Sequence, residues 1–275
     1  MTDIFSEALD MLFPQGIYCI CCGSILDGSR PYAVCDDCLG KFSWITEDTC
    51  SVCGKPLAAM NRKRGICYSC AEREHSFDKG YTCAQYGLYE RAIVMDLKYR
   101  DKSYLAGSVG RIMADRIEAE LGTDLPWDAV TWVPVHRKRL AERGYDQAEL
   151  IASAFMDAMA EKTERTGRAG GIPALEGFLE RAQSTRPMKD LGLMERMENV
   201  SGAFRVKKEE NVRGKTILII DDVYTTGATL DACALALKAA GAGRVEILTF
   251  ASGGDYAGTR GEDDPDEGYD RKERR

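Results

Sequence analysis

The chain of 275 residues has no apolar run long enough to cross a membrane, and no cationic stretch near its first residue leads into an apolar segment. A membrane-spanning helix needs about 20 mostly apolar residues, and a secretory leader places positive charge before its apolar core. We therefore expect neither membrane insertion nor export. The sequence favours a cytoplasmic protein.

Basic residues are not in excess either. The 37 lysines and arginines stand against 44 aspartates and glutamates, which gives a net charge of −7. A protein that binds nucleic acid over much of its surface is usually basic, because it must neutralise phosphates. The balance argues against that class and leaves only a local basic face open. Residues 261–267 add acidity and have little to bury, so we expect a disordered charged tail at 253–275.

One segment lacks the Gly-Lys-Ser/Thr ending of a Walker phosphate loop, but it carries the other parts of a phosphate site. Four aliphatic residues, 217–220, predict a strand buried on both faces of a parallel sheet. Asp221 and Asp222 then stand at its carboxyl end. From Thr226 onward, apolar residues recur at helical spacing up to Gly241, so a helix is expected to begin at the turn.

The turn between this strand and this helix is suited to a phosphate group. The first N–H groups of a helix are unpaired and lie at the positive end of its dipole. We predict that residues 225–229 wrap a phosphate with amides and hydroxyls, while Gly227 lets the backbone come close. Asp221 and Asp222 would accept hydrogen bonds from the vicinal hydroxyls of a sugar, or hold a metal bound to them. A simple helix cap and turn explains each part, but not their order.

This ordered string resembles the phosphoribosyl pyrophosphate (PRPP) motif of type I phosphoribosyltransferases. In that family the acidic pair holds the ribose hydroxyls, and the following loop holds the phosphate of the sugar. The resemblance implies PRPP binding with magnesium bridging ribose and pyrophosphate oxygens, and a catalytic role for Asp221 and Asp222. The implied PRPP-binding residues are Asp221, Asp222, Val223, Tyr224, Thr225, Thr226, Gly227, Ala228 and Thr229.

Cysteine is almost absent after Cys83, because ten of the 11 cysteines stand at or before it. Eight of them form four pairs with two intervening residues, a spacing that lets two thiolates bind one zinc ion. The gaps between successive pairs are allowed for zinc ribbons. We predict two tandem structural zinc sites, one formed by Cys19, Cys22, Cys35 and Cys38 and the other by Cys50, Cys53, Cys67 and Cys70.

The sequence leaves other arrangements of these thiols open. A cross-braced pairing fits the spacing too. Disulfides are disfavoured in a reducing cytosol, and eight thiols exceed what a redox centre needs. Closed zinc sites should stabilise the fold rather than catalyse a reaction. Near the second set, Arg62, Lys63, Arg64 and Tyr68 are compatible with nucleic-acid contacts, and a solvated hairpin fits them equally well.

The remainder of the chain carries the pattern of an α/β domain. Strands are expected at 82–86 and 129–135, helices at 89–99, 105–121 and 146–160, and a flexible insertion at 166–171. We expect a type I phosphoribosyltransferase-like parallel sheet with helices on both faces, preceded by a small zinc-ribbon module. The predicted units are an N-terminal helix with the double zinc-binding module at 1–76, the phosphoribosyltransferase-like domain at 77–252, and the charged tail.

The strand at 129–135 is followed by a basic loop. In an open α/β sheet, ligands collect at the carboxyl ends of strands, and a departing pyrophosphate needs cations to hold its charge. The candidates for this role are Arg137, Lys138, Arg139 and Arg143. His136 is one of only two histidines, and an exposed loop residue is favoured over a general base. The charged segment 181–204, with Arg196, is predicted to be a lid over the ligand, or else an ordinary surface loop with a short helix.

These segments together resemble the ComF family of competence proteins. The resemblance rests on the cysteine pairs, the segments 97–99, 133–135, 143–150 and 196–200, and the PRPP motif, and it spans Pro14 to Ala251. It implies a zinc-binding N-terminus joined to a type I phosphoribosyltransferase domain, a bacterial setting, and participation in natural transformation with internalised single-stranded DNA. Two departures stand out. Tyr145-Asp146 replaces the usual Phe-Asn, which leaves the role of Asp146 open, and Tyr224 replaces a smaller apolar residue.

The leading hypothesis is a phosphoribosyltransferase-like protein that binds PRPP and acts in DNA uptake, with an unknown acceptor. The alternatives are a non-catalytic zinc-containing adaptor or nucleotide sensor of the uptake machinery, a nucleotide-salvage phosphoribosyltransferase, and a zinc-dependent assembly factor for a competence helicase. The intact Asp221-Asp222 and Thr225-Thr226-Gly227 argue against the last of these. Fold alone does not separate the others.

Overall fold

The computed structural model describes residues 16–27, 30–46, 48–167, 172–181 and 203–255. Its strands are β1 (Lys79–Gln85), β2 (Ala129–Trp132), β3 (Ala174–Leu175), β4 (Leu179–Arg181), β5 (Phe204–Val206), β6 (Thr216–Tyr224) and β7 (Arg244–Ser252). Its α-helices are α2 (Asp36–Leu39), α3 (Tyr68–Glu72), α4 (Leu88–Tyr99), α5 (Leu105–Leu121), α6 (Arg137–Arg143), α7 (Gln147–Thr166) and α9 (Ala228–Ala239). Short 3-10 helices lie at Pro31–Ala33, Ala59–Asn61 and Glu209–Asn211.

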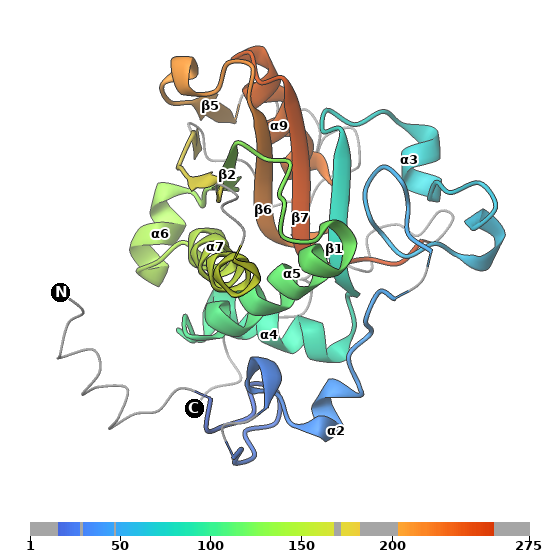
Figure 1. The fold of residues 1–275 in the computed structure, drawn as a ribbon, viewed down its shortest axis with the longest axis vertical. Helices are drawn as coiled ribbons and strands as arrows, with labels where there is room; N and C mark the ends of the chain where they lie inside the picture. Colours follow the sequence, from blue (N-terminus) through green and yellow to red (C-terminus); the bar gives the residue numbers. More distant parts are fainter. Residues whose placement is uncertain (1–15, 28–29, 47, 168–171, 182–202, 256–275) are drawn as a thin grey trace.

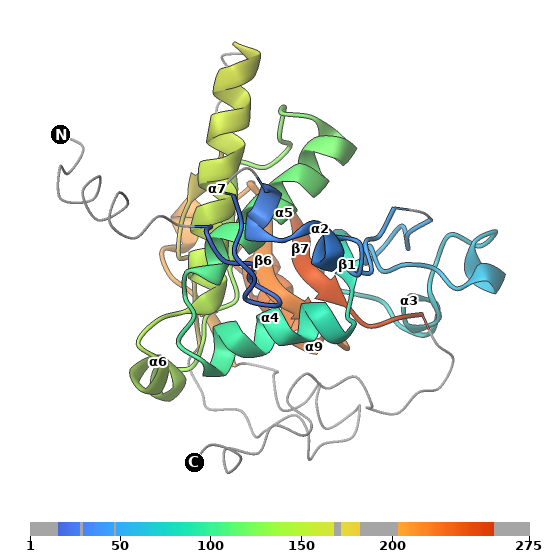
Figure 2. The same ribbon diagram turned by 90° about the horizontal axis from the view of Figure 1, so that it is seen from below.

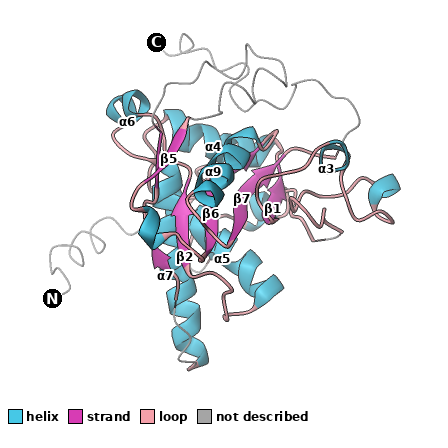
Figure 3. Cartoon of the chain, turned by 90° about the horizontal axis from the view of Figure 1, so that it is seen from above, coloured by secondary structure: helices cyan, strands magenta, loops and turns pink. Residues whose placement is uncertain are grey.

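Within the described residues, the main sheet has five strands in the order β1-β7-β6-β2-β3, and every neighbouring pair is parallel. Helices cover both faces of it. Figure 3 shows the strands in a row, with α9 on one side and α5 and α7 on the other. The parallel sheet with helices on both faces, predicted from the sequence, is therefore confirmed. A separate antiparallel pair is formed by β4 and β5.

Strand β6 shows why the aliphatic run folds as it does. Leu218 and Ile220 belong to the core beneath α5 and α7, whereas Ile217 and Ile219 belong to the core beneath α9. Successive side chains of a strand point to opposite faces, so a strand covered on both sides must be apolar throughout. Among the described helices, none has the length and apolar character that crossing a membrane requires.

Several predicted elements lie where the sequence placed them. The helix predicted at 105–121 has the bounds of α5, and it ends at Gly122, whose φ is 76°. The helix predicted at 89–99 is α4, with one more residue at its start. Others differ at their ends. The helix predicted at 146–160 continues to Thr166, and the strand predicted at 129–135 stops at Trp132.

The most consequential difference concerns β6. The strand does not stop at Ile220 but continues to Tyr224, so the two aspartates lie inside it. It continues because β7 supplies partners along its whole length, with Asp221 opposite Thr249 and Val223 opposite Ala251. A local apolar pattern does not report this pairing, because the partner strand is distant in sequence.

The cysteine-rich segment wraps around the β1 edge of the sheet (Figure 1, Figure 2). Cys19 and Cys38 of its first part join the core on the α5 face, and Cys53 of its second part joins the core on the α9 face. Between the two, residues 43–45 run antiparallel beside β1, where Ile45 N donates to Cys83 O at 3.0 Å. An edge strand with unpaired backbone groups invites incorrect pairing. Here its outer side is covered.

The second cysteine-rich part touches β1 backbone to backbone. A Cβ atom added at Gly80 would lie 2.7 Å from Cys53 O, and one added at Gly54 would lie 2.5 Å from Gly80 O. Gly54 also has a φ of +75°, which side chains rarely tolerate. Glycine at these two positions lets the cysteine-bearing turn lie directly on the sheet.

We expect Gly80→Ala to lower the free energy of unfolding by roughly 1–3 kcal/mol, since the added methyl group forces two backbones apart. Urea denaturation in buffer that contains zinc measures the change. The matched control is Gly107→Ala on α5, where an added Cβ meets nothing within 4 Å. The stability of that variant should be unchanged or slightly higher, since alanine has a higher helix propensity than glycine. Equal effects of the two substitutions would contradict the close contact.

Candidate functional site

The eight paired cysteines form two groups of four. The sulfur atoms of Cys19, Cys22, Cys35 and Cys38 all lie within 4.8 Å of one another, and so do those of Cys50, Cys53, Cys67 and Cys70. All 11 cysteines lie in the described part of the chain, and none forms a disulfide there. The groups have the tandem arrangement expected from the spacing, not the cross-braced one. We call the segments that carry these groups, residues 16–40 and 48–76, the first and second ribbon.

The donor chemistry of each group fits zinc. Four thiols that converge on one point offer the tetrahedral sulfur set that zinc prefers. Backbone N–H groups support these sulfurs: Cys35 N donates to Cys19 Sγ and Cys67 N donates to Cys50 Sγ, each at 3.4 Å. The hydrogen bond with the Ser24 side chain lowers the pKa of the Cys22 thiol to about 6, which favours the thiolate that binds metal. Four protein ligands leave no open position, so the ribbons are structural centres.

Two carboxylates lie at the carboxyl end of β6. The Asp222 side chain is 4% exposed, and Lys98 Nζ lies 3.1 Å from its Oδ1. Gln147 Nε2 donates to its Oδ2 at 3.4 Å. The neighbouring Asp221 is only partly exposed, and its Oδ1 accepts a hydrogen bond from Asp222 N at 2.9 Å. Burial, together with the negative charge of Asp222, raises the pKa of Asp221 well above its ordinary range.

A tight loop, residues 225–227, joins β6 to α9. Gly227 has a φ of +78° and stands directly before the helix. Ala228 N, in the first turn, donates to Thr226 Oγ1 at 3.4 Å. A helix of 12 residues that begins at the end of a buried strand presents its unpaired N–H groups to a ligand at that sheet edge. The loop therefore has the form that the sequence predicted for a phosphate site.

Some of the predicted site residues have side chains that are buried in the cores and do not reach the candidate site. Val223 and Tyr224 belong to β6, with 8% and 1% exposure, and their side chains pack in the two cores. Ala228 is buried against α9 neighbours, and Thr229 is partly exposed. Of Val223 and Tyr224, only the backbone is available to the site.

The basic segment predicted as a loop is instead the helix α6. Its sequence is rich in good helix formers, and Gly144 ends it with a φ of 84°. His136 is its N-cap, with Nδ1 accepting a hydrogen bond from Lys138 N at 3.2 Å, so this histidine has a structural place. Arg137, Lys138 and Arg139 are exposed.

Arg143 differs from the other basic residues of α6 because it turns toward the carboxylates. Its guanidinium donates to Gln147 Oε1 and lies 5.8 Å from the centre of the Tyr99 ring. Gln147 in turn contacts Asp222, and Tyr145 Oη donates to Leu97 O at 2.6 Å. Residues 97–99 and 143–147 thus contact one another and surround the Asp222 carboxylate.

Asp146, whose role the sequence left open, links the segment that follows β2 to a helix. Its Oδ2 accepts a hydrogen bond from Val135 N at 2.8 Å, and its Oδ1 accepts one from Ala148 N at 3.0 Å in the first turn of α7. Burial raises its pKa. Asp146 is the N-cap of α7 and fixes the place of Gln147 beside it.

Some predicted features lie outside the described residues. These are Arg196 with the rest of the predicted lid at 182–202, the start of the chain at 1–15, and the tail at 256–275. Their assignments stay predictions, and so does the division of the chain into units at 76 and 252. Arg62, Lys63 and Arg64 are exposed on the second ribbon, while Tyr68 is partly buried.

Sequence reasoning gave no role to Lys98 and Gln147, which form the surroundings of Asp222. Lys98 stands near the end of α4 and Gln147 at the start of α7. A cation or amide at the end of a helix is a weak signal alone. Their place becomes informative only once the helices are known to end at the carboxyl edge of the sheet.

Comparison with known proteins agrees with this architecture. The family model for a double zinc ribbon domain matches residues 8–71, and the one for a phosphoribosyl transferase domain matches residues 179–271. Together with the parallel sheet and the two cysteine groups, these matches define a phosphoribosyltransferase-like protein that carries an N-terminal double zinc ribbon.

The relatives confirm the resemblance to the ComF family. The chain is similar to competence protein F of Haemophilus influenzae, with 24% identity over 231 residues, or 79% of this chain and 96% of the relative. It is also similar to DNA utilization protein YhgH of Escherichia coli K12, with 23% identity over 219 residues, or 78% and 88%. The same protein of Salmonella typhimurium is 25% identical over 201 residues, or 72% and 81%.

A solved structure of glutamine PRPP amidotransferase from B. subtilis, complexed with ADP and GMP, matches with a TM-score of 0.33 and 19% identity. The match covers 54% of this chain and 26% of that one. The fold assignment rests on the strand order and the family models instead.

Metal analysis of the purified protein should give two zinc ions per chain, because each ribbon supplies a complete ligand set. Cys22→Ser and Cys53→Ser should each retain one ion. Cys83→Ser, which changes a buried cysteine outside both groups, should retain both. A wild-type content well below two ions would contradict the assignment.

Asp221→Asn should stabilise the ligand-free protein at neutral pH. The folded-state pKa of Asp221 lies above the ordinary value of 3.8, so between the two values the folded chain holds a proton that the unfolded chain does not. The free energy of unfolding therefore falls as the pH rises through this window, and it stays low above it. Asparagine removes that loss.

Melting temperatures of the wild type and of Asp221→Asn, measured from pH 4 to pH 8, provide the test. The gap between them should widen as the pH rises. Asp157→Asn, at an exposed position of α7, is the control and should show no such trend. A variant that is less stable than the wild type at every pH would refute the argument.

Proposed function

We propose that the protein binds PRPP and acts as a phosphoribosyltransferase-like component of DNA uptake in the cytoplasm. The observation that carries the proposal is the meeting of Asp221 and Asp222 with the 225–227 loop at the start of α9, all at one edge of the sheet. PRPP has a ribose between a phosphate and a pyrophosphate, and this edge offers matching groups in that order.

Each part of PRPP has candidate partners. The loop and the first N–H groups of α9 are suited to the 5-phosphate, and Asp221 and Asp222 to the ribose hydroxyls. Arg143 is the basic residue of α6 that contacts the Asp222 surroundings, so it is the first candidate for pyrophosphate. Arg137, Lys138, Arg139 and Arg196 remain further candidates.

The acidic pair also fits a divalent cation between ribose and pyrophosphate oxygens. Magnesium prefers oxygen ligands and keeps several of its own waters and substrate oxygens. When bound, it would neutralise charge on the departing pyrophosphate. The chain itself contributes Lys98, whose Nζ lies 3.1 Å from Asp222 Oδ1 and offsets the negative charge of that carboxylate.

In a transfer reaction, a nucleophile would bond to the anomeric carbon while the bond from that carbon to pyrophosphate breaks. Pyrophosphate leaves with the electron pair, and cationic side chains stabilise it. The nucleophile loses its proton to solvent or to a nearby base. The identity of the acceptor is open, and both a nucleobase and single-stranded DNA are to be tested.

The names of the relatives support a role in competence. Competence protein F and DNA utilization protein YhgH are similar to this chain over most of its length. The exposed Arg62, Lys63 and Arg64 on the second ribbon offer a local basic surface for single-stranded DNA. The second candidate function, a non-catalytic adaptor or sensor that works with a competence helicase, is favoured by the presence of this exposed basic surface on the second ribbon.

Calorimetry with PRPP and magnesium tests the proposal. The wild type should bind, and Asp222→Asn should weaken binding roughly 10- to 100-fold, because hydrogen bonds to a charged acceptor contribute about 1.5–3 kcal/mol. Asp157→Asn is the matched control and should bind as the wild type does. A wild type that does not bind PRPP would refute the proposal.

The same proteins should then be assayed for pyrophosphate release with each nucleobase and with single-stranded DNA. Release that depends on one acceptor, and that is lost in Asp222→Asn, supports a transferase. Tight binding of PRPP without release for any acceptor supports the adaptor or sensor.

A further inference from the structure

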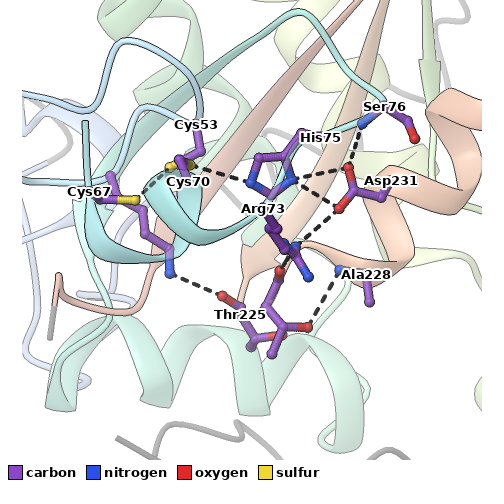
Figure 4. Close-up of polar contacts among 11 residues, drawn as sticks. Cys53, Cys67, Cys70, Arg73, His75, Ser76, Thr225, Ala228 and Asp231 are labelled. Atoms are coloured by element: carbon purple, nitrogen blue, oxygen red, sulfur yellow. Dashed lines mark hydrogen bonds and ion pairs between the residues drawn. The ribbon is translucent and has the colours of Figure 1, made fainter. Parts of the chain in front are cut away.

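The 225–227 loop is held from its outer side by two cations of the second ribbon. Lys55 Nζ donates to Thr225 O at 3.1 Å, and the Arg73 guanidinium donates to Thr226 O (Figure 4). Lys55 is 5% exposed and the Arg73 side chain 16%. Hydrogen bonds with charged donors are stronger than neutral ones, and low exposure limits their competition with water.

Fixing these carbonyl groups also fixes the opposite side of the loop. In a trans peptide the C=O and the next N–H point in opposite directions, and the described residues contain no cis peptide. When the carbonyls of Thr225 and Thr226 face the ribbon, the N–H groups of Thr226 and Gly227 face away from it. That is the side on which a phosphate would lie.

The same arginine ties the ribbon to the start of α9. Arg73 Nη2 lies 3.0 Å from Asp231 Oδ2, and Ser76 N donates to Asp231 Oδ1 at 2.9 Å. Asp231 stands in the first turn of α9. The ribbon thus contacts both the loop and the helix whose N–H groups complete the candidate phosphate site.

One contact reaches a cysteine of the second group. The ring of His75, whose side chain is 1% exposed, lies between two partners. Its Nδ1 is 3.0 Å from Asp231 Oδ2, and its Nε2 is 3.3 Å from Cys70 Sγ. A histidine that links a metal-binding sulfur to a carboxylate orients both. The four-sulfur group and the start of α9 are therefore joined by a single ring (Figure 4).

Tyr224, the residue that departs from the family pattern, fills the space between the loop and the ribbon. Its ring packs edge-on against Phe77 at 6.2 Å, and Lys55 Nζ lies 4.9 Å from its centre. A Cβ atom at Gly227 would lie 2.5 Å from Tyr224 Oη, so ring and loop are in direct contact. The large side chain is explained by the presence of the ribbon.

The first ribbon provides a contrast. Its contacts with the α/β part run to α5, where Tyr32 Oη donates to the Asp115 carboxylate, and to the core on that face. The two ribbons have the same ligand chemistry but contact different parts of the fold. The first can therefore serve as an internal control for the second.

We propose that Arg73 and Lys55 are positioning residues of the phosphate site, and that the metal-loaded second ribbon holds them so that the loop presents its N–H groups to the ligand. The inference rests on the proposed function, since it takes the 5-phosphate of PRPP as the group that the loop binds. Coupling between two sites is reciprocal, so a bound 5-phosphate also retains zinc in the second ribbon.

Arg73→Gln in the full-length, zinc-loaded protein tests the positioning role, with affinities for PRPP, ribose 5-phosphate and pyrophosphate measured by calorimetry. The variant should weaken PRPP and ribose 5-phosphate by the same factor, roughly tenfold, and should leave pyrophosphate unchanged. Arg73→Lys should recover part of the loss. Arg30→Gln, which removes an arginine that pairs with Asp36 on the first ribbon, should leave all three affinities unchanged.

The outcomes are distinct. Equal weakening of all three ligands indicates general damage and overturns the inference, as does an unchanged affinity for ribose 5-phosphate. A wild type that binds neither PRPP nor ribose 5-phosphate refutes the proposed function itself. If it binds and only the inference fails, the proposed function stands.

The zinc affinity of the wild type provides a measurement that needs no variant at the loop. Equilibrium competition with a zinc-binding dye should resolve two sites, one for each ribbon. Ribose 5-phosphate should raise the zinc affinity of one site several-fold, and pyrophosphate should raise neither. The tightened site should be the one that is missing in Cys70→Ser. Tightening of both sites, or of neither, would overturn the inference.

Discussion

All strands of the main sheet run in one direction, and the candidate site depends on this constraint. Because parallel strands end at the same edge, the segments that follow β1, β2 and β6 leave the sheet together. Lys98 of α4, Gln147 of α7 and Asp222 of β6 meet there although they are far apart in the chain. The two aspartates then differ in kind. Asp222 is paired with Lys98, whereas burial and the nearby charge of Asp222 raise the pKa of Asp221.

The ribbons are best understood as parts of the same core. A segment of their size cannot bury enough apolar surface to fold alone, and zinc usually supplies the missing stability. Here each ribbon also joins one of the two cores of the sheet. The glycine contact at Gly54 and Gly80 shows how close the second ribbon comes. The cysteine-rich ribbons and the α/β sheet therefore share their hydrophobic cores.

Local patterns in the sequence predicted the features that neighbouring residues determine. The bounds of α5 follow from apolar spacing and Gly122, and the two zinc groups follow from cysteine spacing. The tight turn at 225–227 follows from an aliphatic run, a glycine and a helical apolar spacing in that order. The features that the sequence did not predict depend on residues that are distant in the chain. Strand β6 runs past Ile220 because β7 pairs with it, and the contact of Lys55 with Thr225 joins residues 170 positions apart. Helix α6 stands where a basic loop was predicted, because its lysine, arginines, leucine, alanine and glutamate are also good helix formers.

The position of β1 has a consequence for synthesis. Among the described strands of the main sheet it is the first to leave the ribosome, yet its only described strand partner in that sheet is β7, the last of them. Its inner edge therefore stays unpaired while the rest of the domain is translated. Residues 43–45 precede it and already occupy its outer edge. During synthesis, the N-terminal segment can therefore cover the outer edge of β1. Only the inner edge of β1 then remains unpaired until β7 is translated.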